Sequence, residues 1–111
     1  LFLSHGRIGD VRQAQGDLAG ALTAYQDSLI LMIKLTTTDP TNNSWQADLA
    51  ASHGNIGQVL AAQGQASEAL KHFTDGHKII AGLLERYPDV AKWQSYLQSF
   101  DANIARLAPP R

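Results

Sequence analysis

Residues 4–11 read SHGRIGDV, and nearly the same stretch returns at residues 52–59 as SHGNIGQV. The 48-residue offset also relates Pro40 to Pro88 and Trp45 to Trp93, and residues 4–51 match residues 52–99 at about 17 positions. A fixed period of this length indicates that copies of one supersecondary unit stack on each other. The repeat therefore predicts neighbouring units that share a continuous core.

Composition narrows the possible classes of protein. The chain has 111 residues, 44% of them hydrophobic and 17% charged, with a formal net charge of -1. Without a basic stripe to neutralise phosphates, nucleic acid is not an expected partner. The longest apolar run, residues 29–33, is far shorter than the roughly 20 residues of a membrane span. We therefore expect no membrane partner, and with no visible signal peptide we favour a cytoplasmic location.

Glycine and proline punctuation divides the chain into five expected helices, and no segment alternates for long enough to predict a strand. Gly16 and Gly64 are typical C-terminal stops, and Asp17 is a good N-cap for the helix that follows it. Asn43 with Gln46 three residues later fits a capping box. The expected helices cover about residues 1–15, 18–38, 44–63, 66–86 and 89–107.

The period also sets the expected domain organisation, which is a single domain over residues 1–111. Repeat 1 covers about residues 1–40 and repeat 2 about residues 41–88, followed by a single helix at about 89–107. Leu1 aligns with Leu49 inside the repeat, so we expect repeat 1 to be truncated and further repeats to lie upstream. The last helix has no partner helix after it, which is typical of a terminal cap on a repeat stack.

Packing residues recur in one register, with a large residue before a small one, a glycine turn, an alanine and then an aromatic residue. This combination resembles the tetratricopeptide repeat family, whose usual unit is about 34 residues. The 48-residue period is then a long-helix variant. The resemblance implies an all-α, right-handed superhelix of antiparallel helix pairs. The residues that carry it are Ile8, Gly9, Gly16, Ala21 and Tyr25, and then Ile56, Gly57, Gly64, Ala69 and Phe73.

The resemblance also implies a concave groove lined by the first helix of each pair. The positions that face it carry polar residues three apart, and the copies differ there while their packing residues agree. We therefore predict a non-catalytic protein-protein interaction module that binds a peptide or partner protein in the groove; an ordinary solvated face is the alternative interpretation. The candidate binding residues are Arg7, Asp10, Gln13, Asn55, Gln58, Asn103 and Arg106.

No motif in the sequence predicts catalysis or metal binding. No nucleophile elbow, Walker loop or HExxH motif is present, and the four histidines have no carboxylate at ligand spacing, so we expect no enzyme activity, metal or cofactor. Residues 29–33 are apolar almost all round a helix, which predicts burial on two sides. The alternative is a contact with another copy or with upstream repeats, which would make the chain a structural spacer or oligomerisation element.

Overall fold

The computed structural model describes residue 13 and residues 15–108. This part of the chain is helical, without strands, and consists of α2 (Leu18–Thr38), α3 (Asn43–Ala62), α4 (Ala66–Arg86) and α5 (Ala91–Leu107). The all-α expectation is thus confirmed for the described residues. The helix predicted at residues 1–15 lies almost wholly outside them.

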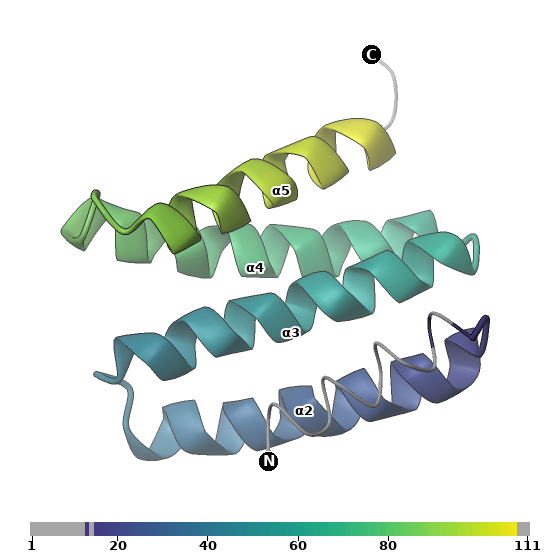
Figure 1. The fold of residues 1–111 in the computed structure, drawn as a ribbon, viewed down its shortest axis with the longest axis horizontal. Coiled ribbons are helices and arrows are strands. Elements are labelled where there is room, and N and C mark those ends of the chain that lie inside the picture. Colours follow the sequence, from purple (N-terminus) through teal and green to yellow (C-terminus); the bar gives the residue numbers. More distant parts are fainter. Residues whose placement is uncertain (1–12, 14, 109–111) are drawn as a thin grey trace.

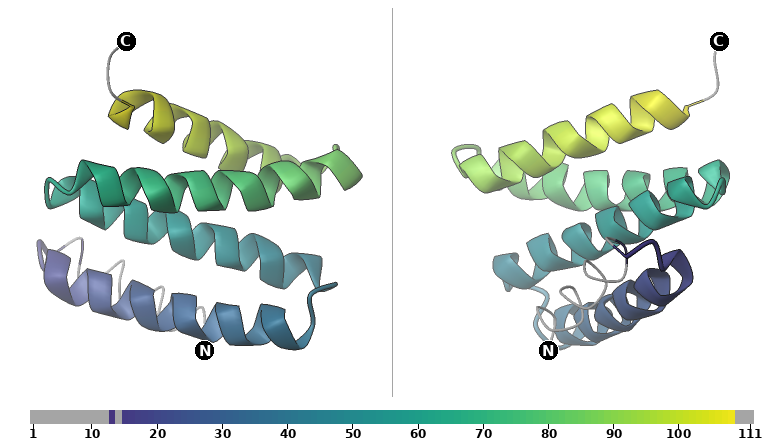
Figure 2. Two further views of the ribbon diagram at one scale, coloured as in Figure 1. Left: turned by 180° about the vertical axis from the view of Figure 1, so that it is seen from behind. Right: turned by 45° about the vertical axis from the view of Figure 1, so that its right-hand side comes forward.

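Each described helix packs against the next one along the chain, and α3 also touches α5. Figure 1 shows α3 and α5 nearer the viewer, with α4 behind them. The reverse view in Figure 2 brings α4 to the front. Two helices that are not adjacent in the sequence, α3 and α5, therefore lie beside each other over α4. None of the helices in the described residues is long and apolar enough to cross a membrane.

Small residues let the helices approach closely, as the repeat pattern predicts. A Cβ atom added to Gly57 would lie 2.8 Å from Cε1 of Phe73, so only glycine leaves room for that ring. Ala69 and Phe73 have no exposed surface, and Tyr25 is 1% exposed. One continuous core results, built from Ala21, Tyr25, Ala47, Ala50, Ile56, Val59, Leu60, Ala69, Phe73, Ile80, Leu83 and Phe100.

The predicted glycine turns are confirmed by the backbone. Gly16 and Gly64 have φ angles of 80° and 81°, in the left-handed region that side chains disfavour. After α3, the amide of Gly64 donates to the carbonyl of Ala61 at 3.1 Å, and the amide of Gln65 donates to Leu60 at 2.9 Å. This pair of bonds is the Schellman motif, which satisfies the last carbonyls of the helix.

The predicted N-cap is confirmed for α2 and is wrong for α3. The Asp17 carboxylate accepts from the amide of Gly20 at 2.9 Å, as predicted. Asn42, and not Asn43, caps α3 by accepting from the amide of Trp45 at 3.1 Å. The predicted capping box is therefore wrong: the Gln46 amide instead donates to the carbonyl of Pro40 at 3.4 Å.

The same loop bond recurs one period later, beside the start of the last helix. The Gln94 side chain donates to the carbonyl of Pro88 at 2.7 Å, which repeats the bond between Gln46 and Pro40. The predicted start of the last helix near residue 89 is wrong, because α5 begins at Ala91 with Val90 as its cap. The first helical bond runs from the amide of Gln94 to the carbonyl of Val90, so the two residues before Val90 belong to the turn.

The apolar run at residues 29–33 is less buried than predicted. Met32 is 1% exposed, but Ile30 is 53% exposed and Ile33 is 47% exposed. Among the described helices α2 packs only against α3, so α3 covers one side of α2 and leaves these two isoleucines at the surface. The prediction of burial on two sides is wrong for this pair.

Candidate functional site: a groove between α3 and α5

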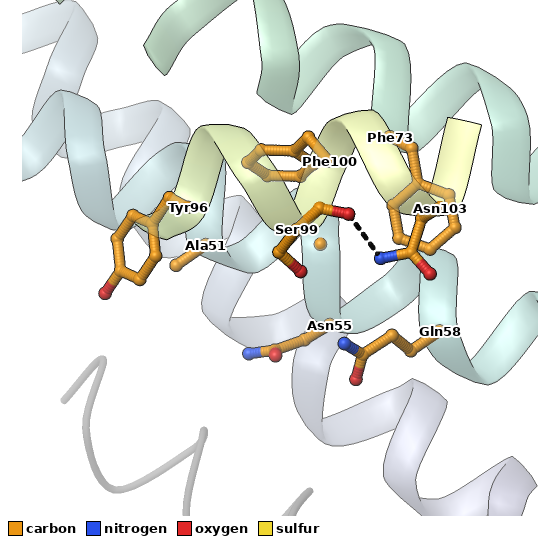
Figure 3. A pocket seen from close by; sticks show the side chains of 9 residues that line it. Ala51, Asn55, Gln58, Phe73, Tyr96, Ser99, Phe100 and Asn103 are labelled. Atoms are coloured by element: carbon orange, nitrogen blue, oxygen red, sulfur yellow. Dashed lines mark hydrogen bonds between the residues drawn. The ribbon is translucent and has the colours of Figure 1, made fainter. Parts of the chain in front are cut away.

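A hollow of about 150 Å³ opens between α3 and α5, with α4 beneath it. Figure 3 shows the side chains around it, with Asn55 and Gln58 of α3 lying opposite Ser99 and Asn103 of α5. The hollow forms where α3 and α5 diverge and touch only sparsely. Its lining residues are Ala51, Gly54, Asn55, Gln58, Phe73, Tyr96, Ser99, Phe100 and Asn103.

The floor of the hollow is aromatic. The rings of Phe73 and Phe100 meet edge to face, with centroids 6.5 Å apart and planes inclined by 64°. Such a pair is favoured because the positive edge of one ring meets the negative face of the other. Gly54 leaves the space that the Phe100 ring needs, since an added Cβ atom would lie 3.3 Å from its Cε1 atom. The floor is therefore apolar and closely packed.

The rim of the hollow is polar and carries side-chain amides. Asn103 donates to the carbonyl of Ser99 at 2.9 Å, and Arg106 donates to the Asn103 side-chain oxygen, also at 2.9 Å. These two bonds hold Asn103 in one orientation on α5. Across the hollow, the Asn55 and Gln58 amides make no hydrogen bond to another described residue. Among the described residues, their donors and acceptors are therefore unpaired.

A second hollow adjoins the first and shares Gln58 and Asn103 with it. We call the two together the α3–α5 groove. Gln13 reaches this second hollow, and its side-chain oxygen accepts from the Tyr25 hydroxyl at 3.3 Å. The lining residues are Gln13, Gln58, Ala61, Ala62, Asn103, Arg106 and Leu107.

Five of the seven residues predicted from the sequence thus line one continuous surface. They are Gln13, Asn55, Gln58, Asn103 and Arg106. The other two, Arg7 and Asp10, lie outside the described residues. These positions, which the family resemblance implied, form the polar rim of the groove.

Sequence reasoning missed the floor of the groove. Phe100 occupies the position that Ser52 holds one period earlier, so the aromatic ring departs from the repeat. Tyr96 likewise replaces Asp48 in the register. These two substitutions of an aromatic for a polar residue are the signal that could have identified an apolar hollow.

Charge on the groove is sparse and positive in the described part of the chain. Arg106 is the charged residue among the lining side chains that the structure describes. Near the other end, the ammonium group of Lys92 lies 5.8 Å from the Tyr96 ring centroid. Burial raises the pKa of the Asp48 carboxyl, and the nearby Lys92 charge partly opposes that increase.

Each of the three histidines that the structure describes contacts a side chain on a neighbouring helix. His53 of α3 and His72 of α4 bring their Nδ1 atoms to 3.0 Å, and both rings are partly buried. His77 of α4 contacts the Asp101 carboxylate of α5 at 2.8 Å on the surface. Neither pair is joined by a third potential ligand, since no group of three or more histidine or acidic side chains gathers in the described residues.

The polar groups of the groove are amides, hydroxyls and one guanidinium. These groups donate and accept hydrogen bonds. The arrangement suits recognition of peptide groups or carboxylates. Comparisons with family models, with curated proteins and with solved structures find no match to this chain. The relation to the tetratricopeptide repeat family accordingly stays a prediction from the repeat.

Proposed function

We propose that this chain is a non-catalytic protein-interaction module of the tetratricopeptide type, and that the α3–α5 groove binds an extended peptide or partner segment. The helix pairs would belong to a right-handed superhelix, with α5 as its terminal cap. The observation that carries the proposal is the convergence of five polar residues, from separate parts of the sequence, on one groove with an aromatic floor.

The second hollow of the groove holds about 490 Å³, but the first, apolar hollow is small enough to suit one side chain rather than a whole ligand. Its volume of about 150 Å³ is below the roughly 300–1,000 Å³ typical of small-molecule sites. One apolar side chain of a bound segment would fit beside Tyr96, while the Phe73 and Phe100 rings, 0% and 5% exposed, close the hollow from below. The amides of Asn55 and Gln58 would pair with the backbone of the segment, because an amide offers both a donor and an acceptor.

Arg106 adds a charge preference to the proposed site. Asn103 already holds the guanidinium at 2.9 Å, which reduces the entropy lost when a ligand carboxylate binds. The expected ligand therefore carries an acidic group beside its apolar side chain. Replacing Arg106 by an acidic residue would repel such a ligand, so this change should weaken binding more than removal of the charge alone.

The test begins with selection of binding peptides from a displayed random library, followed by calorimetry with a selected peptide. Asn55→Ala should weaken binding about fivefold or more, because a lost hydrogen bond is worth about 1 kcal/mol. Arg106→Glu should weaken binding of acidic peptides further. Gln98→Ala is the matched control, since Gln98 is an exposed amide on α5 that does not line the groove.

Two results would contradict the proposal. One is selection of no peptide by the folded protein. The other is a selected peptide whose affinity is the same for the wild type, Asn55→Ala and Arg106→Glu. Circular dichroism of each variant separates loss of binding from loss of folding.

A second candidate function is self-association or stacking, and the exposed face of α2 favours it. Ile30 and Ile33 lie three residues apart, so they share one face of the helix, and about half of each side chain is exposed. Light scattering across a concentration series distinguishes the candidates. A dimer would favour the structural role, and a monomer that captures peptides would favour the groove.

A further inference from the structure

His53 and His72 face each other across the α3–α4 interface with their Nδ1 atoms 3.0 Å apart. Their ring centroids are 5.3 Å apart and the ring planes are inclined by 38°. The centroid separation exceeds the nitrogen separation by about the sum of the two ring radii. The two nitrogens therefore lie close to the line that joins the rings, which is the geometry of a direct N–H···N hydrogen bond.

This hydrogen bond depends on the protonation of both rings. In a neutral imidazole one nitrogen donates and the other accepts, so one ring can donate from Nδ1 while the other accepts. An imidazolium donates from both nitrogens. When His53 and His72 are both protonated, each Nδ1 atom carries a hydrogen and neither can accept. Two donors and two positive charges then face each other at 3.0 Å, which is unfavourable.

The surroundings favour the neutral pair. Burial lowers the pKa of His53; the neighbouring His72 lowers it further, and Asp75 opposes both effects. Burial also lowers the pKa of His72, against the opposing charges of Asp75 and Glu68. Both carboxylates belong to α4, and the main charge effects on the pair include none from the described parts of α2 or α5.

We propose that the His53–His72 pair is a proton-sensitive latch, which holds α3 against α4 at neutral pH and is released when both imidazoles are protonated. The latch is built into the helix pair and does not depend on what the groove binds. It lies next to the groove in the sequence, since Asn55 is two residues beyond His53 and Phe73 directly follows His72.

The direction of the pH effect follows from linkage. Each ring has a lower pKa in the folded chain than its ordinary value of 6.5, so the unfolded chain binds protons more readily in acid. The stabilising effect of the neutral pair is fully present above that ordinary value. It is lost progressively as the pH falls below it, toward the lowered folded-state values.

The repeat supplies a natural variant for the test. One period earlier, the position of His72 is occupied by Ala24, which is buried in α2. His72→Ala therefore places in α4 a residue that the equivalent helix already accommodates. The half-buried His77 provides the matched control, because it lies on the same helix but contacts Asp101 of α5 and not the His53–His72 pair. His77→Gln removes this second histidine and leaves the latch intact.

The experiment measures the unfolding equilibrium by urea denaturation at about pH 7.5 and about pH 5.5. The unfolding constant of the wild type should rise on acidification by about tenfold more than that of His72→Ala, since each extra proton bound by the unfolded chain contributes up to tenfold per pH unit. His77→Gln should keep the wild-type increase. Equal pH dependence in the wild type and His72→Ala would overturn the proposal.

A second measurement does not depend on the stability of any variant. Nuclear magnetic resonance titration of the wild-type imidazoles should show His53 and His72 taking up protons below their ordinary range and in two coupled steps. Acidification should shift the amide resonances of α3 and α4 near the pair. Independent titration of the two rings at ordinary values would overturn the latch.

Discussion

The α2–α3 junction and the α4–α5 junction are related by one 48-residue period, yet they are filled differently. The first junction contains Ser28 of α2 and Ser52 of α3, and both are 1% exposed. In the second junction the corresponding residues, 48 positions later, are Gly76 of α4 and Phe100 of α5, and the phenylalanine ring covers the glycine. One junction buries two hydroxyl groups, and the other buries an aromatic ring against bare backbone.

The difference shows how a repeat can keep its spacing and change its surface. A Cβ atom on Gly76 would overlap the Phe100 ring and lie 3.1 Å from the carbonyl oxygen of Ala50, so the ring and the glycine require each other. Phe100 also forms part of the aromatic floor of the groove. The exchange of serine for phenylalanine thus supplies both the packing of α5 and the apolar hollow.

The largest expected effect comes from removing the ring that distinguishes the second junction. Phe100→Ala should lower the free energy of unfolding by about 3–5 kcal/mol, as is usual for buried phenylalanine. Urea denaturation measures it. Tyr87→Ala is the control, because the Tyr87 ring is 45% exposed and should contribute less. Equal losses in the two variants would show that Phe100 does not hold α5 in place.

Gly76→Ser tests whether the ring and the glycine depend on each other. In the wild type it should cost about 1–3 kcal/mol, because overpacking forces the Phe100 ring to shift. In the Phe100→Ala background the same change should cost much less. A double-mutant cycle measured by urea denaturation gives the coupling energy, and additive costs would contradict the packing that we describe.

The smallest expected effect belongs to the first junction and has the opposite sign. The Ser52 hydroxyl donates to the carbonyl of Asp48 at 3.1 Å, but the buried Ser28 hydroxyl has no hydrogen-bond partner among the described residues. Ser28→Ala should therefore raise the free energy of unfolding by about 1 kcal/mol, since an unpaired buried hydroxyl is unfavourable. Thermal and urea denaturation should agree, and destabilisation would indicate that this hydroxyl is satisfied.

Much of the fold could be predicted from the sequence, because the signals are local. Asp17 caps a helix through its own side chain, and Gly16 and Gly64 adopt the left-handed conformation that ends a helix at the position of each glycine turn. The errors at the helix starts are also local: α3 begins one residue earlier and α5 two residues later than expected, and Gln46 bonds to the carbonyl of Pro40 instead of completing the expected capping box.

The candidate site could be predicted in part. The positions that the family resemblance maps to a groove carry polar residues three apart on one helix face, so the polar rim could be predicted. The floor could not, because Phe100 has significance only when α5 lies across α4 and beside α3. The pairing of His53 with His72 was missed for the same reason: it joins residues 19 apart on different helices.

By itself the sequence determined the all-helical architecture of the described chain, its turns and the face that carries the polar residues, since periodicity and backbone preference act within a few residues. Only the tertiary structure decided which faces meet. Contacts between distant segments depend on how side-chain volumes fit, and so the packing placed an aromatic floor under the groove, left two isoleucines exposed and brought two histidines together.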